Sequence, residues 1–184
     1  LQISTGFLAI IARMKLGLKG ITDSQVLQFA QTLGFEELSF DLRPRSFNFT
    51  QGYKIKEILE QTSTAAGIFL QFENEKSFMI AELMKDLVNS GHSSLGLEVE
   101  KVDNLTEIND LGFIFHLKYQ PEYKLKDLKN CDQLKRLIFT QEFLEELNQN
   151  GELFGFFDIL RTETDFELEV LTDWDNSLIF SLLE

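Results

Sequence analysis

Four ionisable side chains fall at the expected ends of strands and could do acid–base chemistry: Lys19, Glu98, His116 and Lys118. A carboxylate and an imidazole can exchange protons with a substrate near neutral pH, and an ammonium can bind an anion or, once desolvated, act as a base. With alternate side chains of a strand facing one way, Glu98, His116 and Lys118 could converge near Lys19. They form either a new catalytic set or a charge network in which they neutralise one another. We favour the network, because carboxylates in an acidic chain keep lysine charged.

These side chains are positioned by an alternation of apolar runs with helical patterns, which is the main sequence signal of secondary structure. The expected strands are 15–18, 37–40, 67–72, 95–99, 112–119, 136–139, 153–159 and 167–171. The expected helices are 24–33, 52–61, 76–88, 105–110, 125–134 and 141–148.

This alternation implies an α/β fold in which crossover helices join parallel strands. Eight expected strands favour a closed (βα)8 barrel, the TIM barrel, over an open doubly wound sheet. Residues 14–184 would form this single domain, which is small for the fold. Only residues 161–166 separate the last two expected strands, too few for a crossover helix. We therefore expect a barrel eroded near its seventh helix, with a local antiparallel pairing as the alternative.

The chain has 184 residues and a formal charge of −13 at pH 7. Such an acidic surface repels nucleic acid and anionic lipid, so neither is an expected partner. The single cysteine, Cys131, excludes an internal disulfide and a thiolate zinc cluster, which fits the reducing cytoplasm. The two histidines, His92 and His116, have no zinc-site spacing, and neither a metal nor another cofactor is expected.

Residues 1–13 precede the first expected strand as an N-terminal extension. Their apolar run, 7–12, is too short to span a bilayer and lacks the basic start of a secretion signal. The extension is either a tag ahead of a start at Met14 or a short helix that closes the barrel floor.

Two segments carry a resemblance to a known family, and each follows an apolar run: Lys19-Gly20-Ile21-Thr22-Asp23, and Arg43-Pro44-Arg45-Ser46-Phe47-Asn48-Phe49. Their order and spacing resemble the start of phosphoribosylanthranilate isomerase, the barrel enzyme of tryptophan synthesis. That family opens with Lys-Ile-Cys-Gly-Ile-Thr, and its second loop reads Tyr-Pro-Lys-Ser-x-Arg-Tyr. The resemblance is close over residues 14–75 and extends to about 140.

The resemblance implies that the proton-transfer positions are substituted. The family's general base, a cysteine, falls on Lys19, and its general acid, an aspartate ending the sixth strand, falls on Thr140. Glu98 takes roughly the place of a histidine in the fourth-strand motif. A threonine hydroxyl has no useful acidity near neutral pH.

The family's binding positions are also changed. Its loop arginine, which binds the anthranilate carboxylate, falls on Asn48, with Arg43 and Arg45 close by. Lys118 is a further candidate for binding an anionic ligand. The expected phosphate loops, 161–165 and 172–175, have no glycine and together carry four carboxylates, whereas the family binds phosphate through glycine-rich backbone.

These substitutions lead us to expect a diverged, isomerase-like barrel that is a pseudoenzyme with a binding or structural role. It would bind a small molecule at the barrel mouth or a protein partner. The alternative is an active N-(5-phosphoribosyl)anthranilate isomerase of tryptophan biosynthesis, with Glu98 or Lys19 as base and His116 as acid. Gene neighbourhood would separate the two: a complete tryptophan operon with no other copy of the isomerase favours the enzyme.

Overall fold

A computed structural model of the chain describes residues 17–102, 104–163, 167–171 and 177–180. The strands are β1 (Gly17–Lys19), β2 (Glu37–Asp41), β3 (Gly67–Phe72), β4 (Leu95–Val99), β5 (Ile114–Lys118), β6 (Leu134–Thr140), β7 (Glu167–Leu171) and β8 (Ser177–Phe180). The helices are α2 (Ser24–Thr32), α3 (Gly52–Glu60), α4 (Ser77–Asn89), α5 (Leu105–Asn109), α6 (Leu125–Lys129), α7 (Gln141–Gln149) and α8 (Leu153–Glu163).

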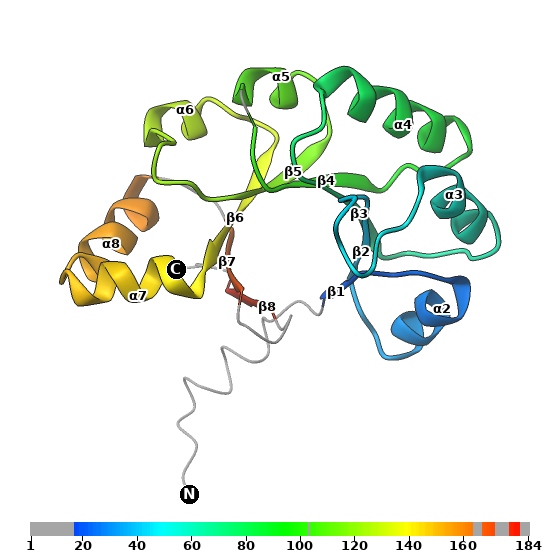
Figure 1. Ribbon diagram of the computed structural model, residues 1–184, viewed down its shortest axis with the longest axis horizontal. Helices are drawn as coiled ribbons and strands as arrows, with labels where there is room; N and C mark the ends of the chain where they lie inside the picture. Colours follow the sequence, from blue (N-terminus) through cyan, green and yellow to red (C-terminus); the bar gives the residue numbers. More distant parts are fainter. Residues whose placement is uncertain (1–16, 103, 164–166, 172–176, 181–184) are drawn as a thin grey trace, which may run out of the picture.

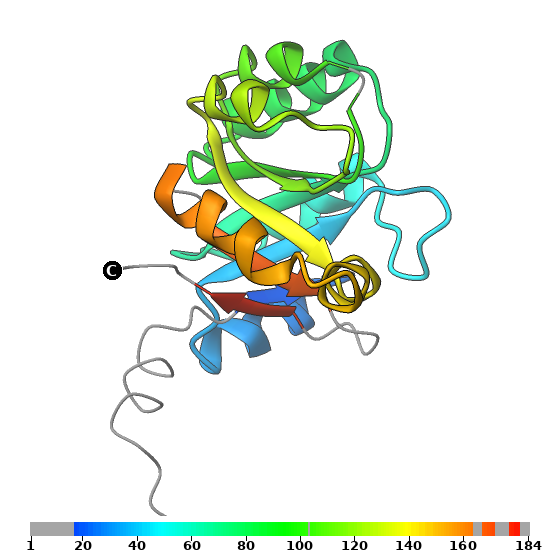
Figure 2. The same ribbon diagram turned by 90° about the vertical axis from the view of Figure 1, so that its left-hand side faces the viewer.

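The strands form one curled sheet in the order of the sequence, β1 to β8. Parallel pairings join consecutive strands from β1 through β7, and β8 pairs antiparallel to β7. The helices lie along the outside of the curl, as Figures 1 and 2 show. We call the concave side of the sheet the lumen, and the end of the lumen at the carboxyl ends of the parallel strands the mouth.

Local sequence signals explain where helices begin and end. Asp23 caps α2, since its Oδ1 accepts a hydrogen bond of 2.8 Å from the backbone N–H of Val26. After α2 the chain turns at Gly34, whose φ of +80° suits glycine. Thr140 ends β6 and caps α7, accepting a 3.3 Å hydrogen bond from the N–H of Phe143.

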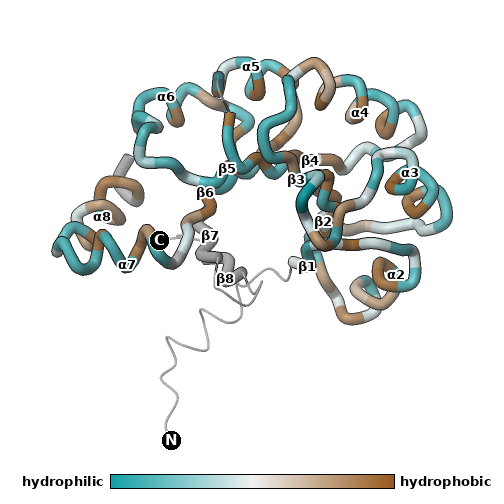
Figure 3. The backbone as a smooth tube through the Cα atoms, viewed as in Figure 1, coloured by the Kyte–Doolittle hydropathy of each residue, from teal (hydrophilic) through white to brown (hydrophobic). Residues whose placement is uncertain are grey.

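The two faces of the sheet differ sharply in polarity. The convex face, covered by the helices, carries large buried apolar side chains, among them Leu38, Phe40, Leu70, Leu97, Phe115, Leu117, Leu137 and Phe139. The alternate residues face the lumen, and many are polar: Lys19, Glu37, Ser39, Glu98, His116 and Arg136. Figure 3 shows hydrophobic residues along the strands and on parts of the surrounding helices. The hydrophobic layer therefore lies outside the curl, and charged groups face its inside.

The expected strand at 153–159 is wrong, because these residues begin helix α8. Its apolar residues follow a helical spacing: Phe156, Phe157 and Leu160 pack inward, whereas Phe154 and Ile159 are exposed. A short apolar run cannot by itself separate a buried strand from a helix. Helix α6 is also shorter than the expected 125–134, since β6 already begins at Leu134.

Because 153–159 is helical, the last strands are numbered differently from the expectation. The expected eighth strand, 167–171, is the seventh, β7, and Ser177–Phe180 forms a strand that the sequence did not predict. Two helices, α7 and α8, lie in the β6–β7 crossover, and α8 extends to Glu163. The antiparallel pairing exists, but it joins β7 to β8.

A full closed barrel is not what the described residues show. Within them, the sheet ends at β1 on one side and at β8 on the other, and no ladder joins these two strands. The fold is an α/β curl of the TIM-barrel type. Residues 1–16, including the N-terminal extension, lie outside the described part of the chain.

Phe69 fills part of the lumen, where its ring lies over glycines of two strands. A β-carbon at Gly96 would come within 2.4 Å of Phe69 Cε1, and one at Gly67 within 3.3 Å of Phe69 Cε2. The same ring stacks on His116 with centroids 4.1 Å apart. Small residues on β3 and β4 therefore make the space that the phenylalanine occupies.

We predict that Gly96→Ala destabilises the fold by about 1–3 kcal/mol, the usual cost of overpacking. Gly67→Ala, with its wider approach to Phe69, should cost clearly less. Adding Phe69→Leu to Gly96→Ala should recover much of the loss, because the clash is with the ring. Urea unfolding of the parent and these three variants measures this, and equal losses at both glycines would contradict it.

Candidate functional site

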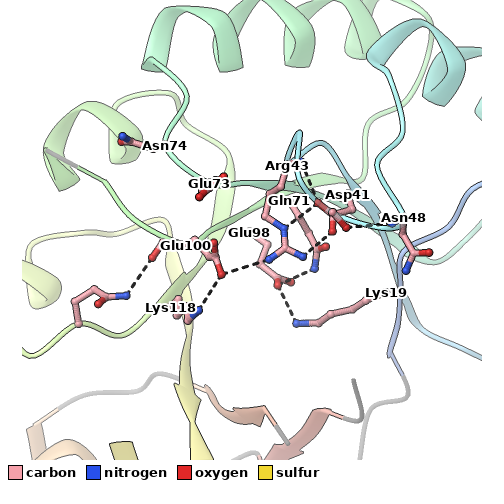
Figure 4. A network of polar contacts seen from close by, with 12 residues as sticks. Lys19, Asp41, Arg43, Asn48, Gln71, Glu73, Asn74, Glu98, Glu100 and Lys118 are labelled. Carbon is pink, nitrogen blue, oxygen red and sulfur yellow. Dashed lines mark hydrogen bonds and ion pairs between the residues drawn. The ribbon is translucent and has the colours of Figure 1, made fainter. Parts of the chain in front are cut away.

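The mouth holds an ion pair that joins the first strand, β1, to the fourth strand, β4. Lys19, at the end of β1, donates from Nζ to Glu98 Oε1 of β4 at 2.8 Å. Gln71 Nε2 of β3 donates to the same oxygen at 2.9 Å. The Lys19 and Glu98 side chains are 24% and 14% exposed, so the pair is partly removed from solvent. Figure 4 shows both side chains pointing toward each other.

A second set of ion pairs continues across the mouth. Arg43 donates hydrogen bonds from Nε to Asp41 Oδ1 at 2.9 Å and from Nη2 to Asp41 Oδ2 at 2.6 Å. Its Nη1 reaches Glu100 Oε1 at 3.3 Å, and Lys118 Nζ donates to that same oxygen at 2.8 Å. We call these side chains, with the previous three, the mouth network: Lys19, Asp41, Arg43, Gln71, Glu98, Glu100 and Lys118. Its three cations are each hydrogen-bonded to a carboxylate of the same network.

Asp41 is the buried anchor of this set. Burial tends to raise the pKa of its carboxyl, but hydrogen bonds from Arg43 and Ser46, together with the charge of Arg43, outweigh it and hold the pKa below its ordinary value of 3.8. The two-pronged contact with a carboxylate in turn raises the pKa of Arg43. Both groups are therefore charged at neutral pH, and each is engaged by the other.

Deeper in the lumen lies a charge cluster that sequence reasoning missed. Arg136 of β6, only 1% exposed, donates from Nη1 and Nη2 to Glu37 Oε2 and Oε1 at 2.7 and 2.9 Å. Its Nη2 also donates to Glu167 Oε2 of β7 at 2.6 Å. We call Glu37, His116, Arg136 and Glu167 the interior network. Strand alternation was the available signal, since Glu37 shares a face with Ser39 and Asp41.

His116 joins the two networks in space. Its Nδ1 lies 3.4 Å from Arg136 Nη1, and its Cα is the cross-strand partner of Glu98. A guanidinium has no lone pair to offer, so Nδ1 faces it as the acceptor and a ring proton belongs on Nε2. His116 is buried, unlike Lys19 and Glu98, which are partly exposed at the mouth. The structure thus brings Lys19, Glu98 and His116 to one cavity at different depths.

Other expected site residues lie apart from these contacts. Arg45 is exposed and has no ion pair within the described part of the chain. Asn48 lies against Gly20, where an added β-carbon would come within 2.5 Å of its Nδ2. Thr140 is committed to capping α7. Arg43 and Lys118, by contrast, belong to the mouth network.

The expected phosphate loops are displaced by the corrected strand order. Residues 161–163 end α8 and precede β7, so they do not follow a seventh strand. Residues 164–166 and 172–176 lie outside the described residues, so the second loop, 172–175, stays a sequence-based expectation. Asp158, which falls within the expected strand 153–159, lies on α8 instead.

The remaining chemistry in the described residues is sparse. No group of three or more histidine, cysteine, aspartate or glutamate side chains among them is arranged to hold a metal ion. Burial, reinforced by Asp127 and Asp132, raises the pKa of the Cys131 thiol, which does not favour a nucleophile. No helix in the described ranges combines the length and apolar character needed to cross a membrane.

Several solved structures have a similar fold. The chain is similar to TrpF of Jonesia denitrificans, with 12% identity, a TM-score of 0.58 and coverage of 74% of this chain and 70% of that one. It is similar to phosphoribosyl anthranilate isomerase of Thermus thermophilus, with 15% identity, a TM-score of 0.54 and coverage of 69% and 62%. The chain thus spans less than two thirds of the Thermus protein's length.

A third similar structure is named for a different activity. N-acetylneuraminate lyase of Fusobacterium nucleatum matches with 11% identity, a TM-score of 0.51 and coverage of 74% of this chain and 60% of that one. No family model matches the chain, and no curated protein matches it. The resemblance to phosphoribosylanthranilate isomerases is therefore confirmed at the level of the fold, and a fold does not by itself carry an activity.

We predict that Lys19→Met destabilises the protein by about 1–3 kcal/mol, between the costs of breaking exposed and buried pairs. The variant would leave the Glu98 carboxylate partly buried. Of its two described hydrogen-bond donors, Lys19 and Gln71, only Gln71 would remain. Lys19→Met combined with Glu98→Met should recover much of the loss, as apolar groups of similar volume can replace an ion pair. A single variant as stable as the parent in thermal melts would remove the network interpretation of Lys19.

We predict that Asp41→Asn destabilises by about 2–4 kcal/mol at neutral pH, since it strips a buried partner from Arg43. Because folding lowers the Asp41 pKa, its stabilisation is complete above 3.8 and is lost as the pH falls through the lowered value. The difference in unfolding free energy between parent and variant should therefore shrink only below pH 3.8. Urea titrations across acidic pH measure it.

Asp86→Asn is the matched control for this prediction. Asp86 pairs with Lys56 at 3.2 Å but is 58% exposed, and exposed pairs contribute at most about 1 kcal/mol. A gap for Asp41→Asn that equals the control's at neutral pH would contradict the anchoring role of Asp41.

Proposed function

We propose that this chain is a diverged phosphoribosylanthranilate isomerase-like protein whose mouth no longer performs the isomerisation and instead has a binding or structural role. The observation that carries the proposal is the mouth network. Lys19, Arg43 and Lys118 are the cations of that network, and each donates to one of its carboxylates. An anionic substrate would have to displace a carboxylate of the network to bind any of these three cations.

The substitutions at the family's two proton-transfer positions support the same proposal. Under that alignment the general base position holds Lys19, which is engaged by Glu98, and the general acid position holds Thr140, which caps a helix. Positioned general acids and bases each contribute typically about 10²–10⁴-fold to a rate. A site without both would fall far below the rate of the family.

The active isomerase is the second candidate, and one observation favours it. Glu98 and His116 are neighbours in cross-strand register and line one cavity, so a carboxylate and an imidazole stand close together. Against it, Glu98 Oε1 already accepts from both Lys19 and Gln71. His116 Nδ1 faces a guanidinium that offers no acceptor.

Rescue of a tryptophan-requiring strain that lacks its isomerase separates the two candidates. We expect no growth without tryptophan when the chain is expressed, and no conversion of phosphoribosylanthranilate by the purified, folded protein. An intact isomerase from the same vector is the positive control, and circular dichroism establishes that the chain is folded. Growth that disappears with Glu98→Gln or His116→Ala would overturn the proposal and support the active enzyme.

A further inference from the structure

Ser39 presents a buried hydroxyl to the lumen. It lies on β2, between its cross-strand partners Lys19 and Phe69. The residue is 4% exposed, and its Oγ has no hydrogen-bond partner within the structure described here. Buried polar groups are nearly always hydrogen-bonded, because leaving one unmade forfeits its interaction with water. The hydroxyl therefore points to a partner that is not among the described protein atoms.

A small cavity lies beside this hydroxyl. It is lined by Ser39 together with Lys19, Glu37, Glu98, His116 and Arg136, among others. The cavity has a free volume of about 20 Å³, and about 10–15 Å³ of such volume is enough for one water molecule. It is far below the several hundred cubic ångströms of ordinary small-molecule sites. Its size therefore selects a guest about as large as one water.

The charges around the cavity select a neutral guest. In the described part of its lining, Lys19 and Arg136 are cations and Glu37 and Glu98 are carboxylates, and they are already joined in pairs. Glu167, which is not among the described lining residues, also pairs with Arg136, so carboxylates outnumber cations around the cavity by one and an anion is not attracted. A neutral molecule that both donates and accepts hydrogen bonds suits such a lining best.

We propose that one ordered water molecule binds in this cavity, with Ser39 Oγ as a ligand, and bridges the mouth network to the interior network. Buried waters make about three hydrogen bonds, and the lining supplies polar atoms from β1, β2, β4, β5 and β6. The water gives Ser39 its missing partner and adds a link between strands on opposite sides of the lumen. It also gives Glu98 and His116 a shared neighbour through which a proton can pass.

Removing the hydroxyl tests this proposal without crowding the cavity. Ser39→Ala deletes one bond to the water, and we expect its melting temperature to fall by about 2–4 °C, the shift for one hydrogen bond in a chain of this size. If the cavity is dry, Ser39→Ala relieves an unpaired hydroxyl, and the melting temperature stays level or rises. A level or raised melting temperature therefore overturns the proposal.

Thr62→Val is the matched control. Thr62 is 6% exposed and its Oγ1 also has no partner in the described structure, but it lies beyond α3 and does not line this cavity. We expect its melting temperature to stay level or rise. A crystal structure of the parent protein then decides directly. Density for a water within hydrogen-bond distance of Ser39 Oγ supports the proposal, and a dry cavity or a Ser39 hydroxyl turned onto a backbone carbonyl overturns it.

Discussion

The guanidinium of Arg136 is the constraint around which the lumen is built. Taking an arginine out of water costs several kcal/mol unless carboxylates and hydrogen bonds replace its hydration. Here Glu37 and Glu167 do so from β2 and β7, with contacts of 2.6–2.9 Å. Since β2 lies four strands from β6 in the sheet, the Arg136–Glu37 contact crosses the lumen. No ladder joins β1 to β8 among the described residues, and this contact holds the two sides of the curled sheet together instead.

Charged groups in the lumen are compatible with stability because the apolar contacts lie elsewhere. The helices pack on the convex face through residues such as Leu38, Phe40 and Leu97, all fully buried. The lumen is then free to hold two polar networks, provided that each buried cation is paired with a carboxylate. This arrangement also sets a limit on function, since side chains that neutralise one another within the protein are less available to a ligand.

Most of the fold could be predicted from the sequence, and the failures have physical causes. The strands from β2 to β6 follow apolar runs bounded by turn residues, and capping residues such as Asp23 mark the helices. The run at 153–159 was misjudged because apolar density alone does not distinguish strand from helix. The Lys19–Glu98 contact followed from the expected barrel. The Arg136–Glu37 contact did not, because 99 residues separate the partners and neither stood at a strand's carboxyl end.

Amide hydrogen exchange of an Arg136→Met variant tests most directly whether this arginine holds the curl together across the lumen. The account predicts that protection falls in β2 and its neighbour β1, on the far side of the lumen, as well as in β6 and β7. Protection in β3 and α4 should change less, because the Arg136 side-chain contacts described above go to β2, β5 and β7. Loss of protection confined to β5, β6 and β7, with β1 and β2 unchanged, would contradict the account.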